Sequence, residues 1–444
     1  MRNNKNKHRD ISADVSYSAA LKKKLSSLDV NDGTRVILTS GKDEYNGVVM
    51  PHHDFSDPDV IVLKLKSGYN VGIKVDKDTK IEVVEQPKVS ERKEKEIKKT
   101  PGLPDIVLIG TGGTIASFVD YRTGAVRPAL SAAQMVDAVP AMREIANVSA
   151  KVLFSIFSEN MTVGHWQELA KAVAEEINNG ADGIIIPHGT DTMGYTAAAL
   201  SFMLPDVTKP VVLVGAQRSS DRPSSDAYSN LMAATRFCNS GNAGIFVVMH
   251  EALGDDKFAV HTGTRVRKMH TSRRDSFKSV NAPLAAKVDE KGKIESSDLA
   301  KSSKKKTTVK TDMEENVVLL QYYPGMSVEK FRDIFKNSNG VVIAGTGLGH
   351  VNSSLIPMIK DACDSGTIVV MTSQCLNGQT NLNVYDNGRD LISAGVISVN
   401  DMLPETAYVK LMWALANSKN SDDAKRIMKT PLAGEMGERR TEDV

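Results

Sequence analysis

The pattern of apolar and polar positions divides the chain into stretches with different periodicity. Residues 1–32 are polar, with a lysine run at 22–24, and predict an N-terminal arm that contains one short helix around 17–28. Residues 33–85 contain five short apolar or alternating runs separated by Gly, Asp, Asn and Pro, a pattern typical of β-strands joined by tight turns. Closing five short strands into a barrel removes unpaired edges, so we expect a small SH3-like β-barrel here.

The pattern changes after a charged segment at residues 86–104, which has Pro near both ends and predicts a linker. Beyond it, continuous apolar runs alternate with helical patterns. The apolar runs are 106–109, 184–186, 211–214 and 245–248. Between the first two, apolar residues from Trp166 to Ile177 follow the spacing of an amphipathic helix. Continuous apolar strands fit a parallel sheet covered on both faces, so the alternation predicts an α/β fold.

A polar, lysine-rich stretch at 286–315 interrupts this alternation. We interpret it as a solvated loop between two subdomains, although its lysines could also meet an acidic partner. Strand-like runs resume at 317–320, 341–344 and 368–371. The pattern therefore predicts two α/β domains, at 105–312 and 313–444.

Composition agrees with an ordinary globular protein. The 444 residues are 41% hydrophobic and 25% charged, with a net charge of +2. The chain has no apolar run of 18 or more residues and no apolar signal-peptide core at its start, so we expect a cytoplasmic protein without membrane association. Its three cysteines are widely spaced, and no His/Cys/Asp/Glu cluster has the spacing of metal ligands, so neither a disulfide framework nor a metal site is expected.

Candidate chemistry is sought first at the loops that follow the apolar runs, because ligands bind at the carboxyl ends of strands in open α/β sheets. Two such loops read GTGGTIAS at 110–117 and PHGTDTMG at 187–194. The first is not a dinucleotide-binding G-x-G-x-x-G, since Ile115 stands in the last glycine position, and the chain has no P-loop. Threonines in both loops and an acid in the second are suited to nucleophilic catalysis. Alternatively, the loops are simply tight strand-to-helix turns.

These loops also carry a family resemblance. GTGGTIAS and HGTDTM resemble the two signature motifs of the L-asparaginase family of amidohydrolases, and the similarity continues through 209–234 and FKSVN at 277–281. The barrel segment GTRVILTSGKDEYNGVVMP and the late segment NGQTNLNVYDNGRDL at 377–391 extend it. The whole chain is thus similar to the GatD family, the D components of archaeal glutamyl-tRNA(Gln) amidotransferases. This resemblance implies an asparaginase-like two-domain unit behind a small barrel.

The resemblance implies roles for individual residues. The implied catalytic residues are Thr114, as nucleophile, with Thr190, Asp191 and Lys268. The implied substrate-side residues are Ser158, which would hold the α-carboxylate, and Glu159, Gly113 and Gly189. Without the resemblance, the basic run 265–268 would indicate a solvated face or a tRNA-phosphate contact. Ser158 would be a helix N-cap, Asp191 a capping residue and His188 an ordinary core or loop histidine.

The chain departs from the family at one position. Asparaginases have a tyrosine on a mobile flap soon after the first motif, where this sequence has Ala125. Tyr121 lies four residues earlier and could serve from a different place. Alternatively, the flap is completed only when a partner binds.

The implied mechanism is attack by Thr114 on the side-chain amide of Gln or Asn, giving an acyl-enzyme, with Thr190, Asp191 and Lys268 as a hydrogen-bonded triad. The resemblance implies a homodimer and a partner, the E component of the amidotransferase, which would bind Glu-tRNA(Gln) and use ATP and Mg²⁺; no cofactor is expected in this chain. The barrel would dock another domain or subunit, or contact tRNA. Two other functions stay open: a free-standing cytosolic L-asparaginase, and a non-catalytic RNA-binding or assembly protein.

Overall fold

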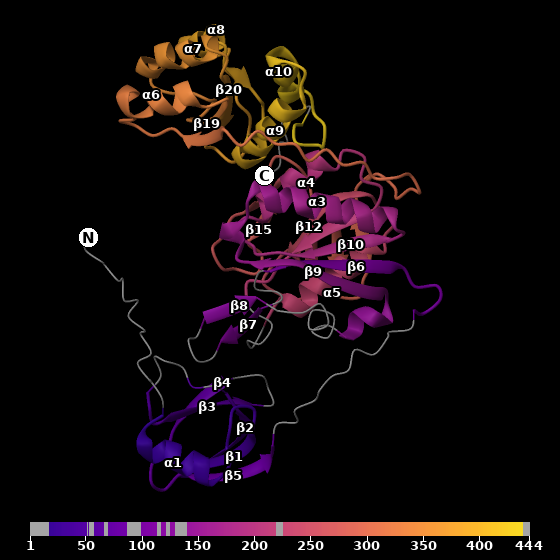
Figure 1. Cartoon of the computed structure of the whole chain (residues 1–444), viewed down its shortest axis with the longest axis vertical. Coiled ribbons are helices and arrows are strands. Elements are labelled where there is room, and N and C mark those ends of the chain that lie inside the picture. The colour runs from indigo at the N-terminus through magenta and orange to yellow at the C-terminus, as the bar shows by residue number, and fades with distance from the viewer. Residues whose placement is uncertain are drawn as a thin grey trace, which may run out of the picture. The chain divides into compact units, whose positions relative to one another are not determined.

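The computed structural model forms two compact units, which are described one after the other. It describes residues 17–50, 52, 57–65, 70–86, 99–112, 117–120, 125–128, 140–218 and 225–437. The first unit is built mainly from the residues up to 86 and the second mainly from residue 99 onward (Figure 1). None of the described helices is long and apolar enough to cross a membrane.

The first unit is a five-stranded antiparallel sheet in the order β4-β3-β2-β1-β5. Its strands are β1 (Arg35–Ser40), β2 (Asp43–Val49), β3 (Val60–Leu65), β4 (Asn70–Lys74) and β5 (Lys80–Glu85). Alternate residues such as Val36, Leu38, Ile61 and Leu63 are fully buried, which is the period-two pattern of a sheet with one apolar face. The five strands predicted from the sequence are therefore all present.

A helix completes this core. Helix α1 (Ala19–Ser27) is capped by Ser18, whose hydroxyl accepts a hydrogen bond from the amide of Leu21. Leu21 and Leu25 are four residues apart, lie on one face of the helix and are buried with the strand residues. The helix around 17–28 was predicted, but treating all of 1–32 as a polar arm was wrong for this part of it. The lysine run at 22–24 hides the two leucines that anchor the helix.

The second unit begins with an eight-stranded sheet in the order β17-β16-β13-β12-β11-β10-β6-β9. Strands β6 (Asp105–Gly112), β9 (Asn147–Ile156), β10 (Gly183–Pro187), β11 (Pro210–Val214) and β12 (Gly244–His250) are parallel. Strands β13 (Lys257–Thr262), β16 (Ala286–Asp289) and β17 (Ile294–Ser296) continue the sheet in antiparallel fashion. The four predicted apolar runs are thus adjacent central strands.

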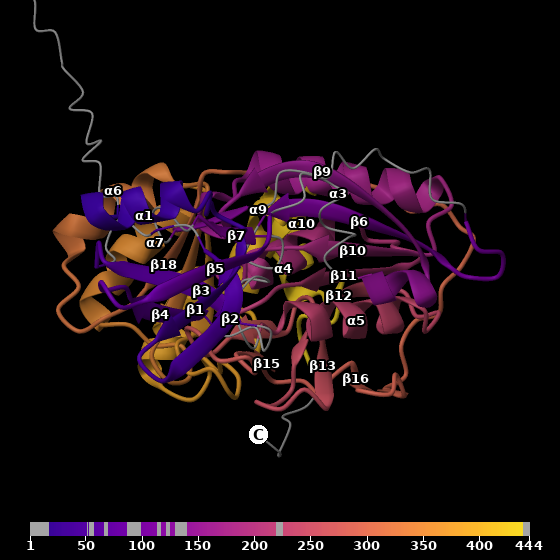
Figure 2. The same ribbon diagram turned by 90° about the horizontal axis from the view of Figure 1, so that it is seen from below.

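Helices cover both faces of this sheet, as the continuous apolar strands require. Figure 2 shows α3 (Val163–Asn178) along one side of the strands and α5 (Ala227–Cys238) along the other. Helix α4 (Met193–Met203) shares the apolar core of α3, whereas α5 packs in a separate core with the opposite face.

Short elements accompany these layers. Strands β14 (Val266–Lys268) and β15 (Phe277–Ser279) pair with each other, and so do β7 (Ser117–Asp120) and β8 (Ala125–Pro128). Two 3-10 helices, η2 (Pro140–Glu144) and η3 (Ser158–Asn160), flank β9. Element η3 and strand β14 matter most for function, because they contain candidate site residues.

The lysine-rich stretch 286–315 is more ordered than predicted. It begins with β16 and β17, because Ala286 and Val288 alternate into the core beneath exposed lysines. Further along, the backbone of Thr307 is held by the side chain of Asn178, which donates to Thr307 O (3.1 Å) and accepts from Thr307 N (2.9 Å). The interpretation as a solvated loop was therefore wrong for its first part.

A second parallel sheet, in the order β18-β19-β20-β21, forms the C-terminal domain. Its strands are β18 (Val317–Gln321), β19 (Gly340–Gly345), β20 (Ile368–Ser373) and β21 (Ile397–Ser398). Helices α6 (Val328–Asn337), α7 (Ile356–Asp364) and α8 (Asp386–Ser393) pack on one face, where η4 (Ser353–Leu355) precedes α7. Helices α9 (Pro404–Asn417) and α10 (Ser421–Lys429) pack on the other. The predicted fold class is confirmed.

The two α/β domains share one apolar core. Residues of α3 and α4 belong to the same buried cluster as residues of α9, α10 and the C-terminal sheet. Apolar burial stabilises by about 25 cal/mol per Å² removed from water, so this continuous core is a strong connection between the domains. It fixes α9 beside α4, and α4 follows directly from the second candidate loop.

Candidate active site

The two candidate loops lie side by side, because β6 and β10 are neighbouring parallel strands. The hydroxyl of Thr111 donates a buried hydrogen bond to Pro187 O (2.8 Å), which ties the ends of the two strands together. Gly112 follows with φ of +104°, and a Cβ there would lie 2.2 Å from Ile156 O. Only glycine fits this conformation and this close approach.

Part of the first loop lies outside the described residues. Gly113 and Thr114 fall within 113–116, and Tyr121 within 121–124, which the structure does not describe. The nucleophile, one substrate-side glycine and the flap tyrosine therefore stay predictions. Ala125, at the position of the family's flap tyrosine, is the first residue of β8.

Three of the predicted catalytic side chains meet at the second loop. Lys268 Nζ donates to Thr190 Oγ1 (2.8 Å) and to Asp191 Oδ1 (2.8 Å). Thr190 and Asp191 lie between β10 and α4, while Lys268 is the last residue of β14, so the contact joins segments 77 and 78 residues apart. This is the hydrogen-bonded geometry that the sequence hypothesis requires.

The exposure of these groups differs. Thr190 is 8% exposed and the Lys268 side chain 14%, whereas the Asp191 side chain is 69% exposed. The alternative interpretation of Lys268 as part of a solvated face is therefore wrong. A hydroxyl beside an amine can pass a proton to it when the amine is neutral, and a carboxylate 2.8 Å from that nitrogen stabilises the ammonium that forms.

Ser158 lies directly against the second loop. It is 4% exposed in η3, and a Cβ on Gly189 would be 2.6 Å from Ser158 Cβ. The Thr192 hydroxyl also donates to Ser158 O (2.7 Å). Ser158 is not the cap of α3, since that helix begins with a capping box at Thr162. The structure thus brings Ser158 and Gly189 together, whereas Glu159 is exposed.

His188 is buried at the end of β10. Its Nδ1 lies 2.7 Å from Gly189 O, and its Nε2 has no hydrogen-bond partner in the part of the chain that the structure describes. Burial lowers its pKa from 6.5 to about 4, with the bond to Gly189 opposing that effect. The ring is therefore neutral at pH 7, and its Nδ1–H donates to the backbone carbonyl, consistent with an ordinary buried histidine.

Sequence reasoning missed a polar network at the end of β11. The buried Asp226 carboxylate accepts hydrogen bonds from the amides of Gln217 and Arg218 (3.0 Å each), and the Gln217 side chain donates to Ser276 Oγ (2.8 Å). Ser276 precedes β15, whose Phe277 pairs with Lys268. The segment 209–234 was noted for its resemblance without a role for Gln217 or Asp226. The signal was a polar stretch directly after an apolar strand.

The groups gathered at this site are hydroxyls, an amine and a carboxylate, which are suited to acyl transfer. Within the described ranges, no group of three or more His, Cys, Asp or Glu residues could hold a metal ion. The chemistry that the site offers is therefore that of a hydroxyl nucleophile with a neighbouring base.

Comparisons with known proteins agree with this geometry. Residues 105–300 match the family model of the asparaginase N-terminal domain, and residues 316–428 that of the glutaminase/asparaginase C-terminal domain. The thermostable L-asparaginase from Thermococcus kodakarensis has a similar structure, with a TM-score of 0.68 and 32% identity over 75% of this chain and 99% of that chain. Fold, site and similarity together define an asparaginase-type amidohydrolase.

The similarity extends to the first unit and to the whole chain. Residues 30–84 match the family model of the GatD N-terminal domain. The D component of glutamyl-tRNA(Gln) amidotransferase from Pyrococcus furiosus is 52% identical over 422 residues, covering 93% of this chain and 96% of that protein. The protein of the same name from Methanosphaera stadtmanae is 46% identical, covering 95% and 97%. The chain belongs to the GatD family of glutamyl-tRNA(Gln) amidotransferase components, as its motifs predicted.

Proposed function

We propose that this chain hydrolyses the side-chain amide of glutamine or asparagine and supplies the ammonia that converts Glu-tRNA(Gln) to Gln-tRNA(Gln). The observation that carries the proposal is the contact of Lys268 with both Thr190 and Asp191, in a chain similar to GatD proteins along nearly its whole length. A non-catalytic RNA-binding protein would have no need to keep this arrangement.

In the proposed reaction, the Thr114 hydroxyl oxygen attacks the amide carbon and ammonia leaves, giving a threonyl ester. Water then attacks the ester, releasing the free acid and restoring the hydroxyl. Lys268, in its neutral form, receives a proton through Thr190, and Asp191 stabilises the ammonium that results. The loop after Gly112 supplies backbone amides for the developing oxyanion.

Substrate binding is proposed on the other side of the loop. Ser158, with Gly189 and Gly113, would hold the α-carboxylate of the amino acid, and Glu159 would act near the substrate's other end. The Ser158 hydroxyl supports this role, because it lies within contact of the loop that carries Thr190. Tyr121 is the candidate for the flap residue.

The partner is proposed to be the E component of the amidotransferase, which binds Glu-tRNA(Gln) and uses ATP and Mg²⁺ to activate the glutamate. This chain would act as a cytoplasmic homodimer without a cofactor of its own. The unit at 33–85, joined to the catalytic domains at 105–312 and 313–444 by the linker 86–104, would dock against a neighbouring domain or subunit rather than take part in the chemistry.

The test is ammonia release from glutamine and from asparagine by the purified chain. It is measured alone, and again with the E component, Glu-tRNA(Gln), ATP and Mg²⁺. Low activity alone that rises at least ~10-fold with the full set supports a coupled amidase. Equal, high activity in both conditions would instead indicate a free-standing asparaginase, and inertness in both would contradict amide hydrolysis. Thr114→Ala is the negative control.

A further inference from the structure

The segment that carries Lys268 is separate from the main sheet. Strands β14 and β15 form a two-stranded sheet of their own among the described strands, with Lys268 paired to Phe277 at its end. A two-stranded ribbon is at best marginally stable by itself. The position of Lys268 therefore depends on the groups that hold this ribbon from outside.

The N-terminal end of the ribbon is held by the C-terminal domain. Thr264 O accepts a hydrogen bond from the hydroxyl of Thr406 (2.9 Å), near the start of α9. The next residue, Arg265, forms a buried ion pair with Asp401 through Nη1 and Oδ2 (2.9 Å). Arg267 Nη1 then contacts Glu405 Oε2 (3.3 Å). These contacts, which fall within four residues of the ribbon segment, all come from a loop and helix far later in the chain.

The end of the chain adds two further contacts. The Thr264 hydroxyl donates to Ala433 O (2.9 Å), and Arg265 Nε donates to Gly434 O (2.8 Å). The segment 431–437 is itself fixed, because Lys410 and Glu435 form an ion pair (2.5 Å) in which neither side chain is exposed.

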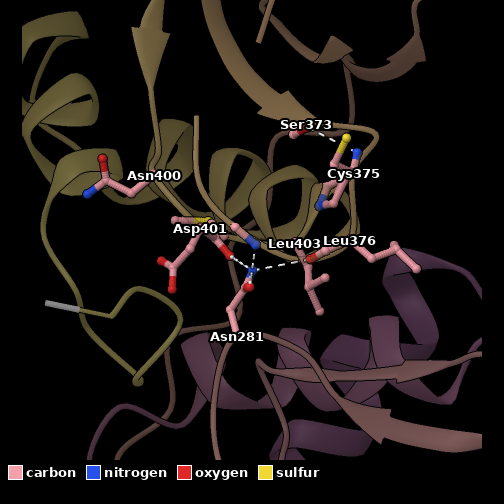
Figure 3. Close-up of a pocket in the computed structure, with 10 residues that line it drawn as sticks. Asn281, Ser373, Cys375, Leu376, Asn400, Asp401 and Leu403 are labelled. Atoms are coloured by element: carbon pink, nitrogen blue, oxygen red, sulfur yellow. Dashed lines mark hydrogen bonds between the residues drawn. The ribbon is translucent and has the colours of Figure 1, made fainter. Parts of the chain in front are cut away.

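Asp401 also reaches the other end of the ribbon. Asn281 follows β15, and its Nδ2 donates to Asp401 O (3.1 Å) and to Leu376 O (3.2 Å), as Figure 3 shows. Asp401 Oδ1 in turn accepts from the amide of Gly437 (3.0 Å). One residue of the C-terminal domain therefore contacts both ends of the ribbon and the terminal segment.

We propose that Asp401 and Thr406 are positioning residues, and that the C-terminal domain with segment 431–437 sets the distance from Lys268 Nζ to Thr190 Oγ1. This inference rests on the proposed function in one respect, which is that Lys268 takes part in proton transfer. Because the ribbon has few contacts of its own, displacement at Thr264 and Arg265 passes along the strand to Lys268.

The test compares Thr406→Val with Thr406→Ser in the full chain. Valine has the shape of threonine but cannot donate to Thr264 O, whereas serine can. A misplacement of about 1 Å at a reacting group costs on the order of 100-fold in rate. We expect Thr406→Val to lower kcat at least ~10-fold with KM within about 2-fold of wild type, and Thr406→Ser to restore kcat. Asp401→Asn should act in the same direction as Thr406→Val.

Hydrogen exchange supplies a readout that does not depend on activity. Amides of residues 264–281 should exchange faster in Thr406→Val than in wild type and Thr406→Ser, with the strands of the main sheet unchanged. Unchanged kcat and unchanged exchange in Thr406→Val would overturn the inference, as would equal losses in the valine and serine variants. If wild type releases no ammonia even with its partner, the proposed function fails, while the exchange data still decide whether these residues hold the ribbon.

Discussion

The contact of Gly189 with Ser158 allows the proposed substrate site to be tested by a single added methyl group. In Gly189→Ala, the new Cβ would lie 2.6 Å from Ser158 Cβ and 2.8 Å from its Oγ. Carbon atoms at their best separation are about 3.5–4.0 Å apart, so Ser158 or the loop must move by about 1 Å. Overpacking of this kind costs about 1–3 kcal/mol of stability. The displaced hydroxyl would no longer meet the substrate's carboxylate.

The assay is steady-state ammonia release from glutamine, with a thermal melt of each variant. We expect kcat/KM to fall on the order of 100-fold, mainly through KM, because a carboxylate contact acts in the ground state and the transition state alike. Gly164→Ala is the matched control, since its Cβ would meet one atom at an ordinary 3.8 Å. Ser158→Gly combined with Gly189→Ala should recover stability but not KM. A folded Gly189→Ala with wild-type KM would refute the role of Ser158.

Three further predictions follow from the site and its supports. Thr190→Val keeps the shape of the side chain but removes the hydroxyl that Lys268 contacts, so ammonia release should fall ~100-fold or more in the same assay with little change in Tm. Because burial lowers the pKa of His188 to about 4, the unfolded state gains a proton below pH 6.5 that the folded state resists; stability should fall by about 3 kcal/mol between pH 6.5 and 4, and urea titrations of His188→Asn should show a shallower fall. Lys410→Met leaves Glu435 buried without its cation, so guanidinium unfolding should show a loss of about 3–5 kcal/mol, partly recovered by adding Glu435→Leu.

The sequence predicts the central strands well because their environment is simple. Strands β10 and β11 are buried at every position, so their residues are continuously apolar, and a run of this kind is visible without knowledge of its neighbours. The loops that follow them can then be located as the place for chemistry. The helix at 163–178 is visible for the same reason, since its apolar face has a regular period.

The role of Lys268 could not be predicted from its neighbours in the sequence. The run from Arg265 to Lys268 has the composition of a solvated basic face. Its acidic partners, Asp401 and Glu405, lie 136 and 138 residues away, and no local pattern links them to the run. The family resemblance identified Lys268, while the ion pairs of Arg265 and Arg267 required the fold. Long-range pairing of buried charges is a property of the tertiary structure.

The lysine-rich stretch after β13 has a consequence for how the protein behaves at high concentration. The main sheet ends at β17, which has three residues and carries Glu295, paired with the exposed Lys293 (2.6 Å). A long apolar strand at that position would offer unpaired backbone groups to the sheet of another molecule. A short, charged final strand gives such a molecule little to pair with. The same lysines that disguise this segment as a loop in the sequence thus protect the edge of the sheet against aggregation.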